Sequence, residues 1–159
     1  MERVYSSRGM SRALRAVSHG VAILSVAAFA YILASAYLIV PIYILLPIFI
    51  SGVPFVAVSL ARRIINAPRP YELLDFYKEK PKNKEGRSFP SRHTFSVFSI
   101  ATLILFLDPL LGAILLILGA ALAVSRVLLG IHFPRDVIAG ALIGVISSLL
   151  GIYIASAFI

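Results

Sequence analysis

The residues best suited to chemistry are concentrated in segment 125–136, which reads SRVLLGIHFPRD and interrupts an otherwise apolar part of the chain. His132 and Asp136 are four residues apart, so on a helix they would share a face. Arg126 precedes His132 by six residues, across Gly130, a residue that favours a turn. A histidine held by a carboxylate has a fixed tautomer and a stabilised cationic form, as a nucleophile or base requires.

Two further polar clusters stand beside apolar runs. Arg62 is followed by Arg69 and a proline, and segment 90–93 reads PSRH. Arginines that converge suit a tetrahedral oxyanion, because each guanidinium can bind phosphate in a bidentate fork. Proline and serine before an apolar run predict a helix start at Ser91, which would add backbone N–H donors and the positive end of a helix dipole. His93, with no carboxylate near it in the sequence, could act as a general acid.

The same residue types argue against a metal site. The chain has no cysteine, so thiolate ligands are excluded. Two histidines and one aspartate surrounded by arginines would repel a divalent cation. The three clusters, if they meet, therefore predict a site for a phosphate group and not for a metal.

The composition predicts a membrane protein. Apolar residues make up 60% of the 159 residues and charged residues only 14%, too few to shield a core from water. The net charge is +8, but Lys and Arg are confined to the N-terminus and to gaps between apolar runs, which argues against a nucleic-acid partner. The length fits one domain over 1–159, so we expect an all-α, polytopic helix bundle in the cell membrane.

Five apolar runs predict about five transmembrane helices. A basic segment, 1–20, precedes the first run, in which the triplet 34–36 (ASA) leaves open a cleaved signal peptide. Residues 70–87 form the one long polar stretch, predicted to be an interfacial helix followed by a solvated loop. The predicted spans are 21–40, 42–61, 88–107, 110–124 and 137–159.

Five spans would bring the three polar clusters to one face of the membrane. All fifteen Lys and Arg would lie on that face, and Asp108 would be the one charged residue on the other. The positive-inside rule then predicts a site that faces the cytoplasm. In the last span, Gly140 and Gly144 begin a stripe of small residues, which could pack within the bundle or join two copies of the chain.

These positions resemble the three motifs of the type-2 phosphatidic acid phosphatase superfamily: K-x6-R-P, P-S-G-H and S-R-x5-H-x3-D. Arg62 stands where the first motif has lysine, and Arg92 where the second has glycine. The third motif, from Ser125 to Asp136, is matched in full. The resemblance covers Arg62 to about Gly144. Membrane members of the family commonly have six spans, one more than we predict here.

The resemblance implies a metal-independent phosphatase for a lipid phosphate or diphosphate, with no organic cofactor. His132 would attack phosphorus and form a phosphohistidine, Asp136 would orient it, and His93 would protonate the leaving group. A membrane phosphotransferase using the same intermediate and a non-catalytic protein that binds lipid phosphates are the alternatives. The residues that would bind the phosphate are Arg62, Arg69, Ser91, Arg92 and Arg126.

Arg92 is the departure with the larger structural consequence. If the backbone there needs a positive φ, a side chain costs about 1 kcal/mol or more. A helix that starts at Ser91 predicts instead an ordinary helical φ, with the Arg92 N–H still available and the guanidinium adding a phosphate contact. The replacement of lysine by Arg62 keeps the charge but changes its geometry.

Overall fold

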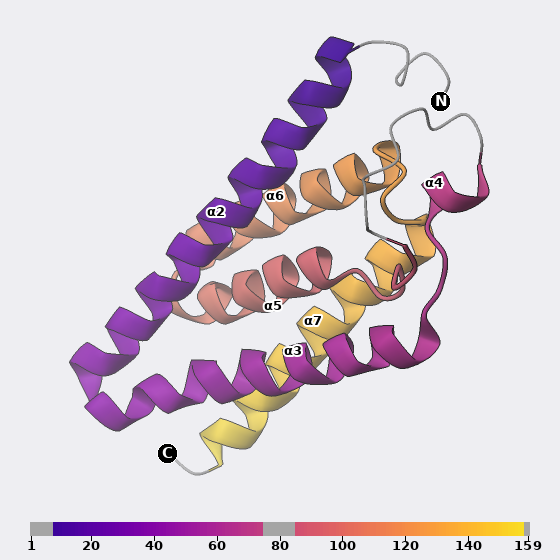
Figure 1. Ribbon diagram of the computed structural model, residues 1–159. Helices are drawn as coiled ribbons and strands as arrows, with labels where there is room; N and C mark the ends of the chain where they lie inside the picture. The colour runs from indigo at the N-terminus through magenta and orange to yellow at the C-terminus, as the bar shows by residue number, and fades with distance from the viewer. Residues whose placement is uncertain (1–7, 75–84, 158–159) are drawn as a thin grey trace.

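All regular structure in the described part of the chain is helical, as the sequence predicts. The computed structural model describes residues 8–74 and 85–157. Figure 1 shows a bundle of long helices. The elements are α2 (Arg8–Ile39), η1 (Pro41–Ile44), α3 (Leu45–Ile65), α4 (Pro70–Leu73), α5 (Arg92–Leu107), α6 (Pro109–Leu128) and α7 (Pro134–Ser156).

The five long helices correspond to the five predicted apolar runs. Four of them are long and apolar enough to cross a bilayer, whereas α5 is shorter. With 16 residues, α5 measures about 24 Å at the usual helical rise. The predicted interfacial helix is reduced to the single turn α4 in the described residues. The rest of that prediction falls partly on residues 75–84, which lie outside them.

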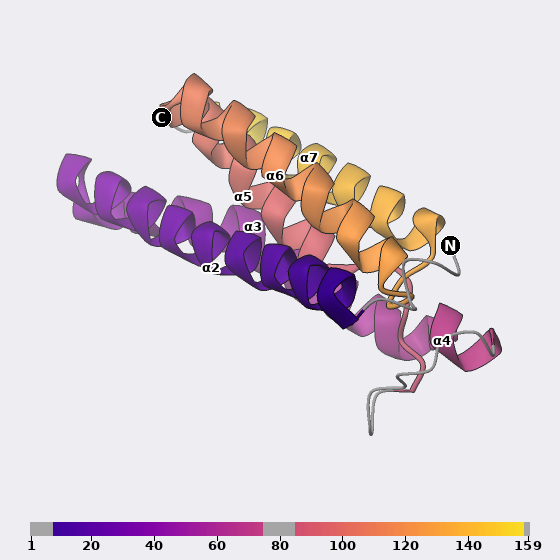
Figure 2. The ribbon, with the colours of Figure 1, turned by 90° about the horizontal axis from the view of Figure 1, so that it is seen from above.

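The shortest long helix lies at the centre of the bundle. Figures 1 and 2 show α5 surrounded by the other long helices, and it packs against α2, α3, α6 and α7. Phe95, Ala101 and Ile104 on this helix are almost completely buried. Because its neighbours cover α5 on several sides, its N-terminal turn is enclosed by the ends of the longer helices.

The stripe of small residues on α7 serves packing within this bundle. A Cβ on Gly140 would lie 2.5 Å from the carbonyl oxygen of Ser91, and one on Gly144 would lie 2.6 Å from that of Phe95. Ser148 continues the stripe, with its hydroxyl 2.8 Å from that of Ser99. The close approach brings the first turns of α5 and α7 together, and α5 covers the surface on which a second copy would have to dock.

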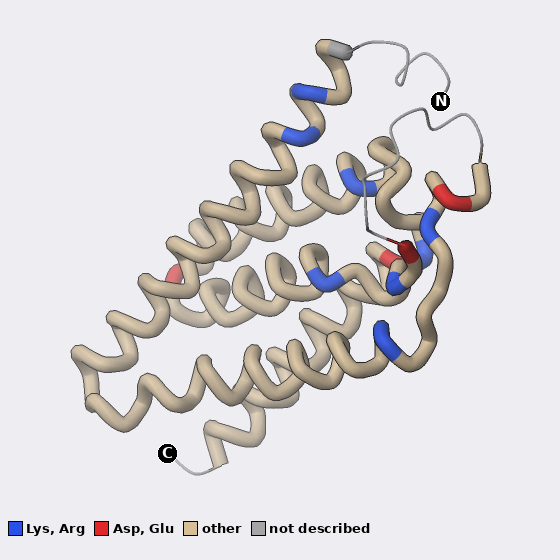
Figure 3. Tube along the Cα trace, in the orientation of Figure 1, with Lys and Arg blue, Asp and Glu red and all other residues tan. Residues whose placement is uncertain are grey.

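Charged residues gather at one end of the bundle. Figure 3 shows the described arginines toward the end where α3 and α6 finish and α5 and α7 begin. Asp108 lies at the opposite end, where its carboxylate caps α6 by accepting the Leu111 N–H at 3.0 Å. The three polar motifs therefore meet at the same end, as five antiparallel spans require.

Candidate active site

A cavity of about 470 Å³ opens at the charged end of the bundle. Its walls come from the ends of α3 and α6, the first turn of α5 and the connections between helices. Glu85 is its one lining carboxylate. Such an excess of positive charge suits a multiply charged anion. The basic lining residues are Arg62, Arg63, Arg69, Arg87, Arg92 and Arg126, with His93 and His132.

Arg62 is fixed in this wall by the backbone of the second motif. It lies in the last turn of α3 and is 6% exposed. Its Nη1 donates to the carbonyl oxygens of Ser88, at 3.2 Å, and Pro90. Asn66 follows in the left-handed conformation, at φ +43°, and ends the helix. The sequence thus turns away from α3 directly after placing Arg62 against the start of α5.

Arg69 joins the two segments that carry the histidines. Its Nε donates to the carbonyl oxygen of Gly86 at 2.9 Å, and its Nη1 donates to that of Ile131 at 3.4 Å. The Gly86 N–H donates in turn to the Glu72 carboxylate at 2.7 Å. Gly86 has φ +63°, the left-handed region that favours glycine, and a Cβ there would lie 2.4 Å from the Asn66 side chain.

His132 lies in the connection between α6 and α7, and not on a helix. Gly130 makes the predicted turn at φ +64°, and His132 is 2% exposed. Asp136 lies in the first turn of α7 and is completely buried. The two side chains face one another, but 3.6 Å separates Nδ1 of the histidine from Oδ2 of the aspartate. This distance is too long for a strong hydrogen bond.

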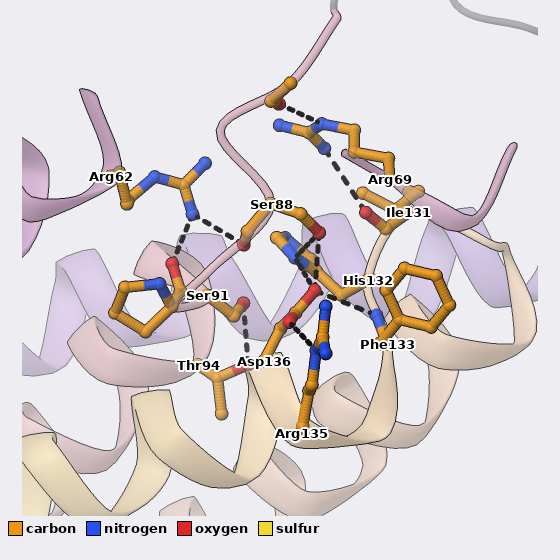
Figure 4. Close-up of polar contacts among 12 residues, drawn as sticks. Arg62, Arg69, Ser88, Ser91, Thr94, Ile131, His132, Phe133, Arg135 and Asp136 are labelled. Atoms are coloured by element: carbon orange, nitrogen blue, oxygen red, sulfur yellow. Dashed lines mark hydrogen bonds and ion pairs between the residues drawn. The ribbon is translucent and has the colours of Figure 1, made fainter. Parts of the chain in front are cut away.

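A serine that sequence analysis missed stands between them. Figure 4 shows the Ser88 hydroxyl above both side chains: it donates to Oδ2 of Asp136 at 2.5 Å and lies 3.3 Å from Nδ1 of His132. The Phe133 N–H donates to the same carboxylate oxygen at 2.9 Å. Ser88 is completely buried. The orientation of the imidazole therefore depends on Ser88 as well as on Asp136.

The environment of His132 favours a neutral imidazole. Burial lowers the pKa of His132, and the neighbouring Asp136 carboxylate opposes this by raising it. The positive charges of Arg69 and Arg62 lower this pKa further. Nδ1 faces Ser88 and Asp136, so Nε2 is the ring nitrogen left for a substrate. A neutral ring with one nitrogen available is what nucleophilic attack requires.

Of the predicted site residues at the start of α5, only some face the cavity. Arg92 and His93 line the cavity, whereas Ser91 does not. Ser91 is completely buried, its hydroxyl accepts from Thr94 at 3.0 Å, and its N–H donates to the Asp136 carbonyl oxygen at 2.9 Å. Its position therefore ties α5 to α7. Arg92 is the first residue of α5 and is not among the described non-glycine residues with positive φ, so its side chain fits there without backbone strain.

Arg126 completes the wall from the end of α6. Its Nε is buried and has no hydrogen-bond partner in the described structure, which leaves a donor for a ligand. The neighbouring Ser125 hydroxyl lies 2.7 Å from that of Ser18, which joins α6 to α2. Some polar side chains that line the cavity were not predicted from the sequence, because isolated Ser, Tyr and Arg residues near helix ends are common. These side chains are Ser59, Arg63, Tyr71 and Arg87.

Long apolar helices are typical of an integral membrane protein, and the basic cavity at the end of the bundle is suited to an anion. The family model described as the PAP2 superfamily matches residues 25–159 of the chain. The chain belongs to this superfamily. This confirms the resemblance seen in the three motifs.

Individual relatives agree with this assignment. The chain is 35% identical over 101 residues to the bacitracin transport permease protein BcrC of Bacillus licheniformis, covering 61% of this chain and 50% of that protein. It is 25% identical over 153 residues to the undecaprenyl-diphosphatase BcrC of Bacillus subtilis (strain 168), covering 87% and 79%. The aligned part thus spans half the length of the first relative.

A solved structure shares the fold. The crystal structure of the first transmembrane PAP2 type phosphatidylglycerolphosphate phosphatase from Bacillus subtilis matches with a TM-score of 0.72. The match covers 95% of this chain and 79% of that one, at 19% sequence identity. The helical arrangement in Figures 1 and 2 is therefore that of a transmembrane PAP2 protein.

Proposed function

We propose that the protein is a lipid phosphate phosphatase that works through a phosphohistidine at His132, without a metal ion. One observation carries the proposal: a buried histidine whose Nδ1 is held by Ser88 and Asp136 lines a cavity with six arginines. Because the contacts at Nδ1 fix the orientation of the imidazole, Nε2 points in a defined direction. The arginines supply the charge that attracts and orients a phosphoryl group.

The three arginines of the family motifs are suited to hold the reacting phosphoryl group. Arg62 and Arg69 each give some N–H donors to backbone carbonyls, which immobilises the guanidinium, and the arginine fork has five donors in all. Arg126 brings a buried donor with no protein partner. Immobile donors lose little freedom when the phosphate binds, so more of their interaction is available to the transition state.

The reaction proceeds in two transfers at phosphorus. Nε2 of His132 attacks, the bond from phosphorus to the lipid oxygen breaks, and His93 gives that oxygen a proton. A water molecule then attacks the phosphohistidine and gives a proton to His93. The P–N bond breaks, which releases inorganic phosphate and restores both histidines.

A lipid is the substrate class that the surroundings favour. The cavity lies at the end of a bundle of membrane helices, and the relative from Bacillus subtilis is named an undecaprenyl-diphosphatase. The name of this relative supports a phosphorylated lipid over a soluble metabolite. The excess of basic residues at the site end supports a cytoplasmic orientation. The chain has no natural cysteine, so Arg87→Cys would introduce a single one. If a membrane-impermeant reagent labels this cysteine in intact cells, the orientation is wrong.

The test is phosphate release from a lipid phosphate by the purified protein in excess EDTA. Wild type is expected to be active, and His132→Ala is expected to lose all measurable release. His19→Ala is the matched control, because this third histidine is exposed on α2 and does not line the cavity. Undiminished release by His132→Ala would overturn the mechanism. Transfer to an added alcohol in place of water would make the protein a phosphotransferase.

A further inference from the structure

The cavity holds more positive charge than one phosphoryl group needs. Three of its six arginines stand where the family motifs have a basic residue, and the others are Arg63, Arg87 and Arg92. A phosphate monoester carries a charge of about −1.5 to −2 at neutral pH. With Glu85 as the one lining carboxylate, a large positive excess would remain after a single phosphate is bound. A second phosphate on the ligand would bring the site closer to neutrality.

Arg92 lines the basic cavity and also contacts an aromatic ring at its edge. Its guanidinium carbon is 5.9 Å from the centroid of the Phe55 ring, a cation–π distance. The Phe55 ring is 6.4 Å from that of Phe95, one turn further along α5. Arg92 therefore faces the basic cavity while it rests on an aromatic pair that leads into the membrane part of the bundle.

An apolar cavity begins at the same aromatic pair. It has a volume of about 250 Å³ and lies between α2, α3 and α5, lined by Phe55 and Phe95 together with Phe29, Ile48 and Ile100 among others. On α3, Phe55, Ser59 and Arg62 follow one another at intervals of four and three residues, so one helix face runs from the apolar cavity to the basic one. Arg92 stands at the junction of the two.

We propose that Arg92 binds the lipid-proximal phosphate of a diphosphate lipid and makes the protein selective for diphosphates over monophosphates. The inference rests on the proposed phosphatase function and adds the substrate class. The lipid chain enters the apolar cavity past Phe55, and the terminal phosphate reaches Arg62, Arg69 and Arg126. The lipid-proximal phosphate then lies between the lipid chain and the terminal phosphate, at Arg92. Stacking on Phe55 holds the guanidinium at this position.

The chemistry follows from that placement. Nε2 of His132 attacks the terminal phosphorus, and the bond from this phosphorus to the bridging oxygen breaks. The bridging oxygen leaves as part of the lipid monophosphate, takes a proton from His93 and has its remaining charge stabilised by Arg92. Water then hydrolyses the phosphohistidine. One diphosphate lipid and one water thus give one lipid monophosphate and one inorganic phosphate.

The test compares farnesyl diphosphate with farnesyl monophosphate, which differ only in the second phosphate. We expect Arg92→Gly, which restores the family residue, to lower kcat/KM for the diphosphate by about tenfold to a hundredfold, the effect of one charge-assisted hydrogen bond. The monophosphate value should change less than threefold. Arg92→Lys, which keeps the charge without the fork, should fall between. Arg63→Ala removes another lining arginine, one outside the contact between Arg92 and Phe55, and should affect both substrates to the same degree.

Equal losses on the two substrates, or none, would overturn the role of Arg92. A binding assay separates this failure from failure of the proposed function. In the His132→Ala background, Arg92→Gly should weaken binding of farnesyl diphosphate and leave the monophosphate affinity nearly unchanged. If wild type releases no phosphate, the phosphatase proposal fails, and the loss or retention of this binding preference still decides the inference about Arg92.

Discussion

The two histidines of the site occupy contrasting surroundings. His132 is buried in a connection, and one of its ring nitrogens faces the Ser88 hydroxyl and the Asp136 carboxylate. His93 lies on the first turn of α5, exposed toward the cavity, and no side chain within the described ranges is recorded as its hydrogen-bond partner. A fixed, buried ring suits attack along one direction, whereas an open ring suits proton exchange with a leaving group and then with water. The contrast supports the different roles that we propose for the two histidines.

Removal of the open histidine should separate these roles. We expect His93→Ala to lower kcat/KM, which reports the transfer to His132 and not the later hydrolysis, by about 10²- to 10⁴-fold on a lipid phosphate, the usual range for general acid–base catalysis. The loss should be smaller on p-nitrophenyl phosphate, whose leaving group needs no proton. His132→Ala should lose activity on both compounds. Stopped assays with the two substrates measure the difference, and equal losses of His93→Ala on both would break the assignment of His93 as the acid.

Ser88 tests what holds the buried histidine. Ser88→Ala removes the hydroxyl between Asp136 and His132, and we expect kcat to fall by about tenfold to a hundredfold, as for loss of one hydrogen bond to a charged group. KM should stay nearly constant, because Ser88 does not line the cavity.

Ser91→Ala is the matched control for Ser88. This substitution removes another buried hydroxyl that lies outside the cavity and is hydrogen-bonded to Thr94. It should lower the thermal stability and have little effect on kcat. A larger kcat loss in Ser91→Ala than in Ser88→Ala would show that the serine of the second motif, and not Ser88, supports the reaction.

The smallest expected effect is a displacement of the pH profile. Burial lowers the pKa of His132 below its ordinary value near 6.5, so the neutral nucleophile persists at mildly acidic pH. The acidic limb of kcat/KM for the free enzyme should therefore lie below pH 6.5. Asp136→Asn removes the carboxylate that raises this pKa, so the limb should move further toward acid while the maximum rate falls. Displacement toward alkaline pH would contradict the burial argument.

Local sequence patterns predicted the helices and the motif positions well. Apolar runs locate all five long helices, and Gly130 and Ser91 mark the turn and the helix start that the structure has. These features depend on near neighbours in the chain. The first turn of α5 likewise accommodates Arg92 because an N-terminal helical residue needs no positive φ.

Contacts between distant segments could not be predicted. Ser88 lies 44 residues from His132 and 48 from Asp136, and a lone serine before a helix carries no signal of that contact. The direction of the Ser91 hydroxyl, away from the cavity, depends on how α5 packs against α7. The central position of α5 also depends on packing, because its apolar sequence is compatible with either a lipid-facing or an enclosed helix.

The central claim is that His132 becomes phosphorylated, and the covalent intermediate tests it most directly. The purified protein would be mixed with a lipid labelled in its terminal phosphate, quenched at alkaline pH, where phosphohistidine survives, and digested for peptide mass spectrometry. We expect transient label on the peptide that contains His132. The label should be greater in His93→Ala, because water is activated poorly there, and absent from His132→Ala. Label on another residue, or steady turnover with no labelled protein at any time, would contradict it.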